Sequence, residues 1–186
     1  YFGWYRGHSP QMGDWLDETH ETYPDVAIGI TEYGAGGSIN HHEENVRRAF
    51  PFAHPWHPEA WQAQVHEDNW REISSREYVW GSYLWNMFDF ASFFRREGDA
   101  LGMNDKGMVT YDKQTRKDVF YFYRANWSEE PTVYIANRRY VKREQAETSV
   151  KVYANAEEVT LSVNGDAYGP VKGEQGIFLF NDVFLT

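Results

Sequence analysis

The chain has 186 residues, a formal net charge of −10 at pH 7 and no cysteine. The acidic balance argues against nucleic acid and anionic membranes as partners, and the absence of cysteine excludes disulfides and thiolate metal sites. No membrane span is expected, because the sequence has no run of about 18 apolar residues.

Strand and helix patterns alternate in the first part of the chain. Residues 1–5 resemble the end of a strand. Residues 9–24 predict a helix, with Ser9 as its N-cap and Pro24 beyond its end. Residues 25–33 (DVAIGITEY) are apolar on both faces, which is typical of a buried parallel strand.

The alternation continues toward residue 127. Residues 57–75 predict a second helix, residues 78–90 a further strand, and residues 115–127 a third helix with Thr115 as its cap. Strands that alternate with helices indicate a parallel sheet, in which functional residues gather at the carboxyl ends of the strands.

Short alternating strands follow Pro131. Asn164-Gly165 predicts a hairpin turn between two of these strands. Apolar residues occupy every second position of the predicted strands: Val150, Val152, Val159, Leu161 and Val163. This region predicts an immunoglobulin-like β-sandwich, expected to be incomplete.

Acidic and aromatic residues lie at the predicted carboxyl ends of three strands. Glu32 ends one strand, Asn86 and Asp89 end the next, and Tyr1 and Trp4 end the one before. We therefore expect these side chains to line one edge of the sheet.

The chemistry suggested by this edge is glycoside hydrolysis. Considered alone, Glu32 is better explained as a solvated loop acid or as half of a structural ion pair than as a catalytic residue. Aromatic residues make up 18% of the chain, and Trp4, Trp80 and Trp85 could form the walls of a sugar site. A carboxylate flanked by aromatic side chains suits an enzyme in which one carboxylate attacks the anomeric carbon and a second carboxylic acid protonates the leaving oxygen.

Four segments together resemble glycoside hydrolase family 2, most closely its β-galactosidases. They are YFGWY (1–5), TEYGAGG (31–37), VWGSYLWNMFDF (79–90) and the stretch from Gly102 to Trp127. The resemblance implies an α/β plus β fold. Residues 1–130 would form the last part of a catalytic (β/α)8 TIM barrel, from the end of strand 6 to helix 8, and residues 131–186 a truncated immunoglobulin-like β-sandwich domain.

The resemblance also implies roles for individual residues. Glu32 matches the nucleophile of the family, Tyr1 a tyrosine that orients it, and Trp85 a wall of the sugar pocket. Other residues expected to bind substrate are Trp4, Asn86 and Asp89. Some relatives bind a cation near the position of Asn104, but no metal is assigned here, and no organic cofactor is implied.

Two departures from the family pattern bear on activity. The acid/base of the family is the Glu of an Asn-Glu pair, and no such pair occurs in this chain. Ala35, Gly36 and Gly37 stand where some β-galactosidases have a histidine. We therefore expect the chain by itself to be an inactive fragment that associates through the open edge of its barrel.

The predicted function is that of a retaining exo-β-glycosidase that acts on terminal β-linked sugars, with β-galactosides first. β-Glucuronidase and β-mannosidase activities are alternatives within the family. A non-catalytic carbohydrate-binding module is an alternative of another class, because the same aromatic edge could bind sugar without turnover.

Several other residues have competing interpretations. His54 and His57 are three residues apart, but the prolines around them break the helix that would align them on a metal, so a structural use is expected. Trp61 and Trp70 have helical spacing and are expected in the core. Trp56 lies between prolines and is a candidate sugar contact.

Overall fold

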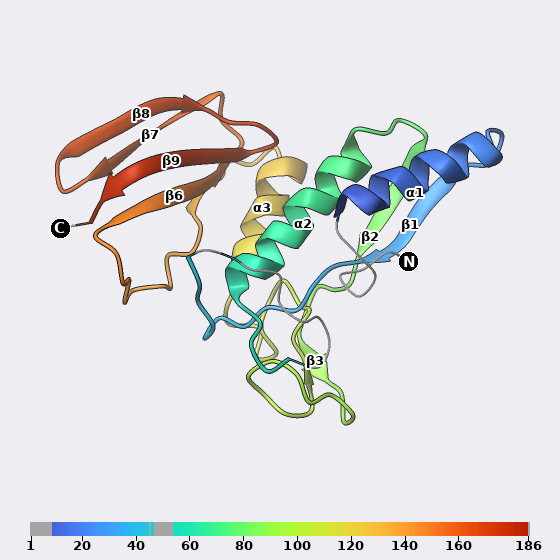
Figure 1. The fold of residues 1–186 in the computed structure, drawn as a ribbon, viewed down its shortest axis with the longest axis horizontal. Helices are drawn as coiled ribbons and strands as arrows, with labels where there is room; N and C mark the ends of the chain where they lie inside the picture. Colours follow the sequence, from blue (N-terminus) through green and yellow to red (C-terminus); the bar gives the residue numbers. More distant parts are fainter. Residues whose placement is uncertain (1–8, 45, 47–53, 186) are drawn as a thin grey trace.

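The computed structural model of the chain describes residues 9–44, 46 and 54–185 (Figure 1). Tyr1 and Trp4, which the sequence analysis placed at the site, lie outside the described residues, as does the strand end predicted at residues 1–5. In Figure 1 the β-rich end of the chain lies on one side, helices α2 and α3 lie in the middle, and α1 with strands β1 and β2 lies on the other side.

Strands β1 (Ile28–Tyr33) and β2 (Val79–Leu84) pair in parallel, which confirms the parallel arrangement. Helices α1 (Ser9–Thr22) and α2 (Glu59–Ser74) match the two helices predicted on either side of β1. The two helices and β1 share one hydrophobic core, whose buried members include Met12, Leu16, Ile28, Ile30 and Ile73. Apolar residues on helix and strand therefore hold the helices on the two-stranded sheet.

The strand predicted at residues 78–90 is shorter than expected. It ends at Leu84, and the chain then forms a separate two-residue strand, β3 (Phe90–Ala91), which pairs antiparallel with β4 (Met103–Asn104). Beyond Trp85, whose amide still donates to Tyr33 of β1, the backbone forms hydrogen bonds with residues 106–109 rather than with a neighbouring strand. The Asn86 amide donates to the Lys106 carbonyl, and the Asp89 amide donates to the Val109 carbonyl.

The third helix, α3 (Asp118–Trp127), begins three residues later than predicted. Thr115 is not its cap, because the Thr115 carbonyl accepts a bond from the Thr110 amide in a separate turn. The acceptor for the first helical amide comes from another helix. The Glu59 carboxylate of α2 accepts a hydrogen bond from the Asp118 amide at 2.8 Å. A tertiary contact therefore sets the start of α3.

The β-rich part contains two small antiparallel sheets. The first has the order β5 (Val133–Ile135), β6 (Glu147–Ala154), β9 (Ile177–Phe184), and the second is the hairpin of β7 (Glu158–Val163) and β8 (Asp166–Lys172). Asn164 and Gly165 have φ angles of 53° and 101°, as the predicted hairpin turn requires.

A second hydrophobic core lies between these sheets. Its buried members come from three strands and are Val152, Ala154, Leu161, Phe178, Phe180 and Val183. The alternating residues Val150, Val159 and Val163 pack against them, which confirms the predicted inward face.

Both apolar and charged contacts join the α/β part to the β-rich part. Phe122 of α3 and Tyr153 of β6 belong to the same buried cluster as the residues of β1. The buried Glu67 of α2 accepts hydrogen bonds from Lys151 and Tyr153. The change from α/β to β elements falls between α3 and β5, and the division into two domains near residue 130 stays a prediction.

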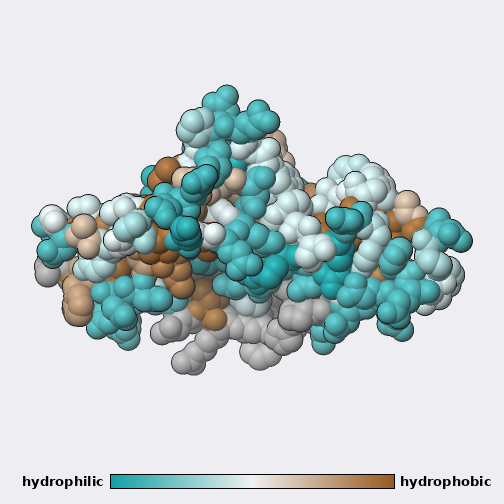
Figure 2. Space-filling model, turned by 90° about the horizontal axis from the view of Figure 1, so that it is seen from above, coloured by the Kyte–Doolittle hydropathy of each residue, from teal (hydrophilic) through white to brown (hydrophobic). Residues whose placement is uncertain are grey.

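The surface is mainly polar. Hydrophilic residues cover most of the face seen in Figure 2, with hydrophobic residues gathered in limited areas between them. Among the described residues, no helix has both the length and the apolar character needed to cross a membrane.

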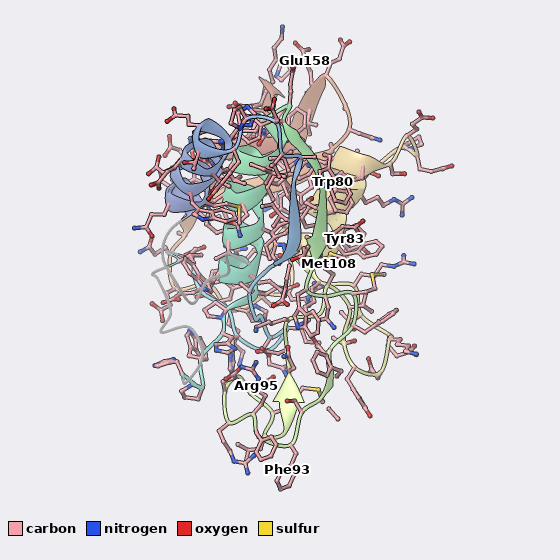
Figure 3. All side chains as sticks on the ribbon, turned by 90° about the vertical axis from the view of Figure 1, so that its right-hand side faces the viewer. Trp80, Tyr83, Phe93, Arg95, Met108 and Glu158 are labelled. Atoms are coloured by element: carbon pink, nitrogen blue, oxygen red, sulfur yellow. The ribbon has the colours of Figure 1, made fainter. Side chains whose placement is uncertain are left out.

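Strand β2 exposes two large aromatic side chains. Trp80 and Tyr83 are 63% and 57% exposed, and their rings meet edge to face at 6.4 Å. Both lie along β2 in Figure 3. An exposed aromatic surface on a strand favours association with another polypeptide.

We predict that the isolated 186-residue chain self-associates through this surface of β2. Static light scattering should give a mass above that of one chain at high protein concentration. The double variant Trp80→Ser, Tyr83→Ser should shift the mass toward one chain, because it removes the apolar surface. The matched control is Tyr111→Ser, which removes an equally exposed tyrosine from a loop. A wild-type chain that stays monomeric at all concentrations would contradict the prediction.

Candidate active site

Glu32 and Trp85 lie at the adjoining ends of two paired strands. Glu32 is the penultimate residue of β1 and is half-buried. The next residue, Tyr33, pairs with Leu84, and its carbonyl accepts a hydrogen bond from the Trp85 amide at 2.8 Å. The carboxyl ends of β1 and β2 therefore lie at the same edge of the sheet, as predicted from the sequence.

The glycine loop after β1 packs tightly against the end of β2. Gly34 has a φ of +148°, and a Cβ atom there would lie 2.5 Å from the Trp85 carbonyl oxygen. A larger residue would clash with the backbone that carries Trp85. Residues 33–38 are all buried, so the loop is part of the interior rather than a mobile lid.

A buried network of neutral groups supports β1 from behind. The Tyr123 hydroxyl donates to the Tyr33 hydroxyl at 3.1 Å and lies 3.0 Å from His66 Nδ1. The Ala35 amide donates to His66 Nε2 at 3.4 Å, so Nδ1 carries the proton and donates to Tyr123. Burial lowers the pKa of His66 to about 3 and raises the pKa of Tyr33 to about 12. The network therefore carries no charge at neutral pH.

Trp85 is positioned to present an aromatic surface. It is 39% exposed, and its ring meets Phe90 edge to face at a centroid distance of 5.9 Å. The peptide bond to Asn86 is cis. The Asn86 side chain donates to the Phe88 carbonyl, and the Asn86 carbonyl accepts from the Met108 amide at 3.0 Å. The segment after β2 is thus fixed by its own polar groups.

One buried lysine joins the loops of this edge. Lys117 is 1% exposed and precedes α3. Its ammonium donates to the Gly37 carbonyl at 2.6 Å, to the Asp89 carboxylate at 2.8 Å and to the Asp105 carbonyl at 2.9 Å. The glycine loop, the segment after β2 and the turn after β4 therefore meet at one nitrogen atom.

Asp89 connects the segment after β2 to the turn after β4. Its Oδ1 accepts from Lys117 and also from the Gly107 amide at 2.8 Å. Burial raises the pKa of Asp89, while the Lys117 charge works in the opposite direction. These contacts give Asp89 a bracing position, and its predicted role in substrate binding stays a prediction. A Cβ atom at Gly107 would lie 2.1 Å from the Asp89 amide nitrogen, so this turn needs glycine.

Two more buried polar residues lie here: Asn104 at the end of β4 and Lys106 in the turn after it. The Asn104 side chain accepts from the Lys106 amide at 3.2 Å, and the Lys106 carbonyl accepts from the Asn86 amide at 3.2 Å. The sequence analysis did not single out Lys106. The sequence feature that could have identified it is a lysine between two glycines, two residues after Asn104. Within the described ranges, no three carboxylate or imidazole side chains form a group that could hold a metal ion.

The remaining sequence candidates have varied positions. Trp56 is stacked on His41 with centroids 4.2 Å apart, and its predicted contact with sugar stays a prediction. His57 contacts Asp105 at 2.7 Å. Trp80 is the second residue of β2, at the opposite end of the strand from Trp85, which places it away from this edge.

The two helical tryptophans pack as predicted. Trp61 packs against Ala35 and Val65, and Trp70 packs against the main core.

Comparison with known proteins shows similarity to part of several larger enzymes. The chain is 46% identical over 176 residues to a beta-glucuronidase of Bacteroides fragilis, covering 94% of this chain and 25% of that protein. Among solved structures, an FMN-binding beta-glucuronidase from Facaelibacterium prausnitzii is 43% identical, with a TM-score of 0.89 over the whole chain and 28% of that protein.

A third relative carries another name. The structure of a candidate beta-galactosidase from Bacteroides fragilis is 35% identical, with a TM-score of 0.90, and the match covers 100% of this chain and 28% of that protein. No family model matches the chain. The chain spans about a quarter of the length of the curated relatives it matches, and enzymes with these names are glycoside hydrolases.

We predict that Lys117→Met strongly destabilises the protein. The substitution leaves the buried Asp89 carboxylate without its cation, and removing one partner of a buried ion pair costs roughly 3–5 kcal/mol. The free energy of unfolding should be measured by urea denaturation.

Lys172→Met is the matched control for this measurement. Lys172 is highly exposed and lies 3.9 Å from Glu158, so its loss should change stability very little. Equal effects of the two substitutions would contradict the central position given to Lys117.

Proposed function

We propose that the chain is part of a retaining exo-β-glycosidase of glycoside hydrolase family 2, with Glu32 as its nucleophile. The observation that carries the proposal is the meeting of the Glu32 and Trp85 strand ends in a rigidly braced edge. The similarity to enzymes named as glycosidases over nearly the whole chain supports it.

The proposed reaction has two steps. The Glu32 carboxylate attacks the anomeric carbon, while a carboxylic acid from a part of the protein outside this chain protonates the leaving oxygen. The same second group then removes a proton from water, which attacks the covalent glycosyl-enzyme and releases Glu32. The exposed face of Trp85 would form a wall of the sugar pocket, and Tyr1 would orient the nucleophile. Trp4 and Asn86 remain candidates for substrate contacts.

The proposed architecture follows the same reasoning. Residues 1–130 would be the last part of a (β/α)8 barrel, and residues 131–186 the start of an immunoglobulin-like domain. The parallel pair β1 and β2 supports the first assignment, with α2 after β1 and α3 after β2 and the short strands β3 and β4. The two packed antiparallel sheets support the second.

The favoured substrates are β-glucuronides. The sequence analysis placed β-galactosides first, but the relatives with 46% and 43% identity are both named as beta-glucuronidases. A glucuronide differs from a neutral glycoside by the carboxylate at C6, which a cation would recognise. Lys117 donates to three protein acceptors. Lys106 follows Asp105 in the turn whose backbone is hydrogen-bonded to Asn86. We assign recognition of the sugar carboxylate to Lys106.

β-Galactosidase activity is the second candidate, because the relative with 35% identity carries that name. No name among the reported relatives favours a β-mannoside. One relative is named as FMN-binding, but hydrolysis through two carboxyl groups needs no flavin, so the proposal gives a cofactor no step.

We predict that Glu32→Gln lowers kcat by several powers of ten in the longer polypeptide that the proposal implies, because the attacking group is removed. A 2-deoxy-2-fluoro glycoside should label Glu32 covalently, as detected by mass spectrometry of the digested protein. Glu18→Gln, on the exposed side of α1, is the control and should keep full activity. A label on another carboxylate would refute the assignment. Sugar binding without any turnover would favour a binding module.

We predict that Lys106→Met lowers kcat/KM for 4-nitrophenyl β-D-glucuronide about 10- to 100-fold, because a charge-assisted hydrogen bond contributes about 1.5–3 kcal/mol. The same substitution should affect the matching galactoside much less, since that sugar has no carboxylate. Lys172→Met serves as the control. Equal losses on both substrates would show that Lys106 does not read the carboxylate.

A further inference from the structure

Asp105 is the most heavily anchored residue of the turn after β4. Its backbone carbonyl accepts hydrogen bonds from the Gly37 amide at 3.1 Å and from the Lys117 ammonium at 2.9 Å. Its carboxylate lies 2.7 Å from His57 Nδ1. Asp105 is thus held from both its backbone and its side chain, and it is buried.

His57 provides a fixed support for that carboxylate. The residue is fully buried and comes two residues before α2. Its carbonyl accepts from the Ser38 amide at 2.8 Å, and its amide donates to His41 Nδ1 at 3.1 Å. The backbone of His57 is therefore set by residues that follow the glycine loop, independently of the turn that carries Asp105.

The Asp105 carboxylate packs closely against Gly98 as well as against His57. Gly98 has a φ of 71°, and a Cβ atom there would lie 2.6 Å from Asp105 Oδ2. This left-handed glycine gives the carboxylate the room it occupies between Gly98 and His57.

In the sequence, Asp105 lies between Asn104 and Lys106, the residue to which the proposed function assigns recognition of the sugar carboxylate. When the carbonyl and the carboxylate of one residue are both fixed, the backbone on either side of it is fixed as well. A hydrogen bond between buried polar groups contributes only modest net stability, so the value of this contact lies in the position that it imposes.

The geometry points to His57 and Asp105 as positioning residues for substrate recognition: His57 holds the Asp105 carboxylate, and Asp105 fixes the turn that presents Lys106 and Asn104. This inference rests on the proposed function for its consequence in catalysis. Its mechanical part, that His57 holds the turn, can be tested without any substrate.

Two variants of His57 distinguish the effect of its hydrogen bond from the effect of its side-chain volume. His57→Leu fills a similar volume but removes the hydrogen bond to Asp105. His57→Asn keeps a donor near the place of Nδ1 and should restore the contact. His20→Leu, on α1 where the ring stacks on Tyr78, is the control for loss of a histidine.

The first measurement is hydrogen exchange of the full-length protein. The amides of Gly107 and Met108, which donate to Asp89 and Asn86, report on the turn. His57→Leu should speed their exchange at least tenfold while amides in β6 and β9 remain unchanged, and His57→Asn should exchange as the wild type does. Unchanged exchange of the turn in His57→Leu, or equal acceleration throughout the protein, would overturn the inference.

The second measurement is a double-mutant cycle on 4-nitrophenyl β-D-glucuronide. His57→Leu should raise KM about tenfold with a smaller change in kcat, and should change KM less than twofold when Lys106→Met is already present. Equal factors in both backgrounds would show that His57 does not act through Lys106. A wild-type enzyme without glucuronidase activity would refute the proposed function, while the exchange result would still decide whether His57 holds the turn.

Discussion

The arrangement of this edge depends on one buried ammonium group. Taking the Lys117 charge out of water costs several kcal/mol unless each of its protons finds an acceptor and its charge finds a partner. Gly37, Asp89 and Asp105 supply two carbonyls and one carboxylate at 2.6–2.9 Å. These acceptors belong to three loops that are distant in the sequence. Because an ammonium offers three donors, satisfying all of them at one nitrogen atom brings the three loops together.

The edge is supported by two networks of different electrical character. Around Lys117 the contacts are charged and hold the loops that would surround a substrate. Behind β1 the contacts join His66, Tyr123 and Tyr33, all neutral at ordinary pH because burial opposes their ionisation. A neutral support can fix the strand that carries Glu32 without placing a competing charge beneath it. The fixed charges lie instead on the loops, where an anionic or polar sugar would be recognised.

Sequence patterns predicted what depends on local spacing. The helices at residues 9–22 and 59–74, the parallel strand pair and the Asn164-Gly165 hairpin all follow from periodicity and turn chemistry. The adjacency of the strand ends that carry Glu32 and Trp85 also followed, since strand ends of a parallel sheet share one edge. The anchors of that edge could not be predicted in this way. Lys117 contacts Gly37 across 80 positions, and His57 contacts Asp105 across 48. No local pattern marks a lysine that will be buried, and the early end of β2 likewise depends on acceptors supplied by residues 106–109.

Helix α2 connects the β-rich part to the loops of this edge. Gln62 of α2 donates to the Ala35 and Gly107 carbonyls, and His66 accepts from the Ala35 amide, so the helix touches two of the loops directly. Two buried carboxylates of α2 also hold this helix against α3 and the β-rich part. Glu59 accepts from Arg139 and from the first amide of α3, and Glu67 accepts from Lys151 and Tyr153 of β6. The Arg139 guanidinium contacts both the Glu59 and the Asp118 carboxylates. Burial and the neighbouring Glu59 charge raise the pKa of Asp118 to about 6. A displacement of β6 would therefore move α2, and with it the residues that brace the loops. The two parts of the chain are thus joined by buried contacts of α2, although a change of fold type separates them along the sequence.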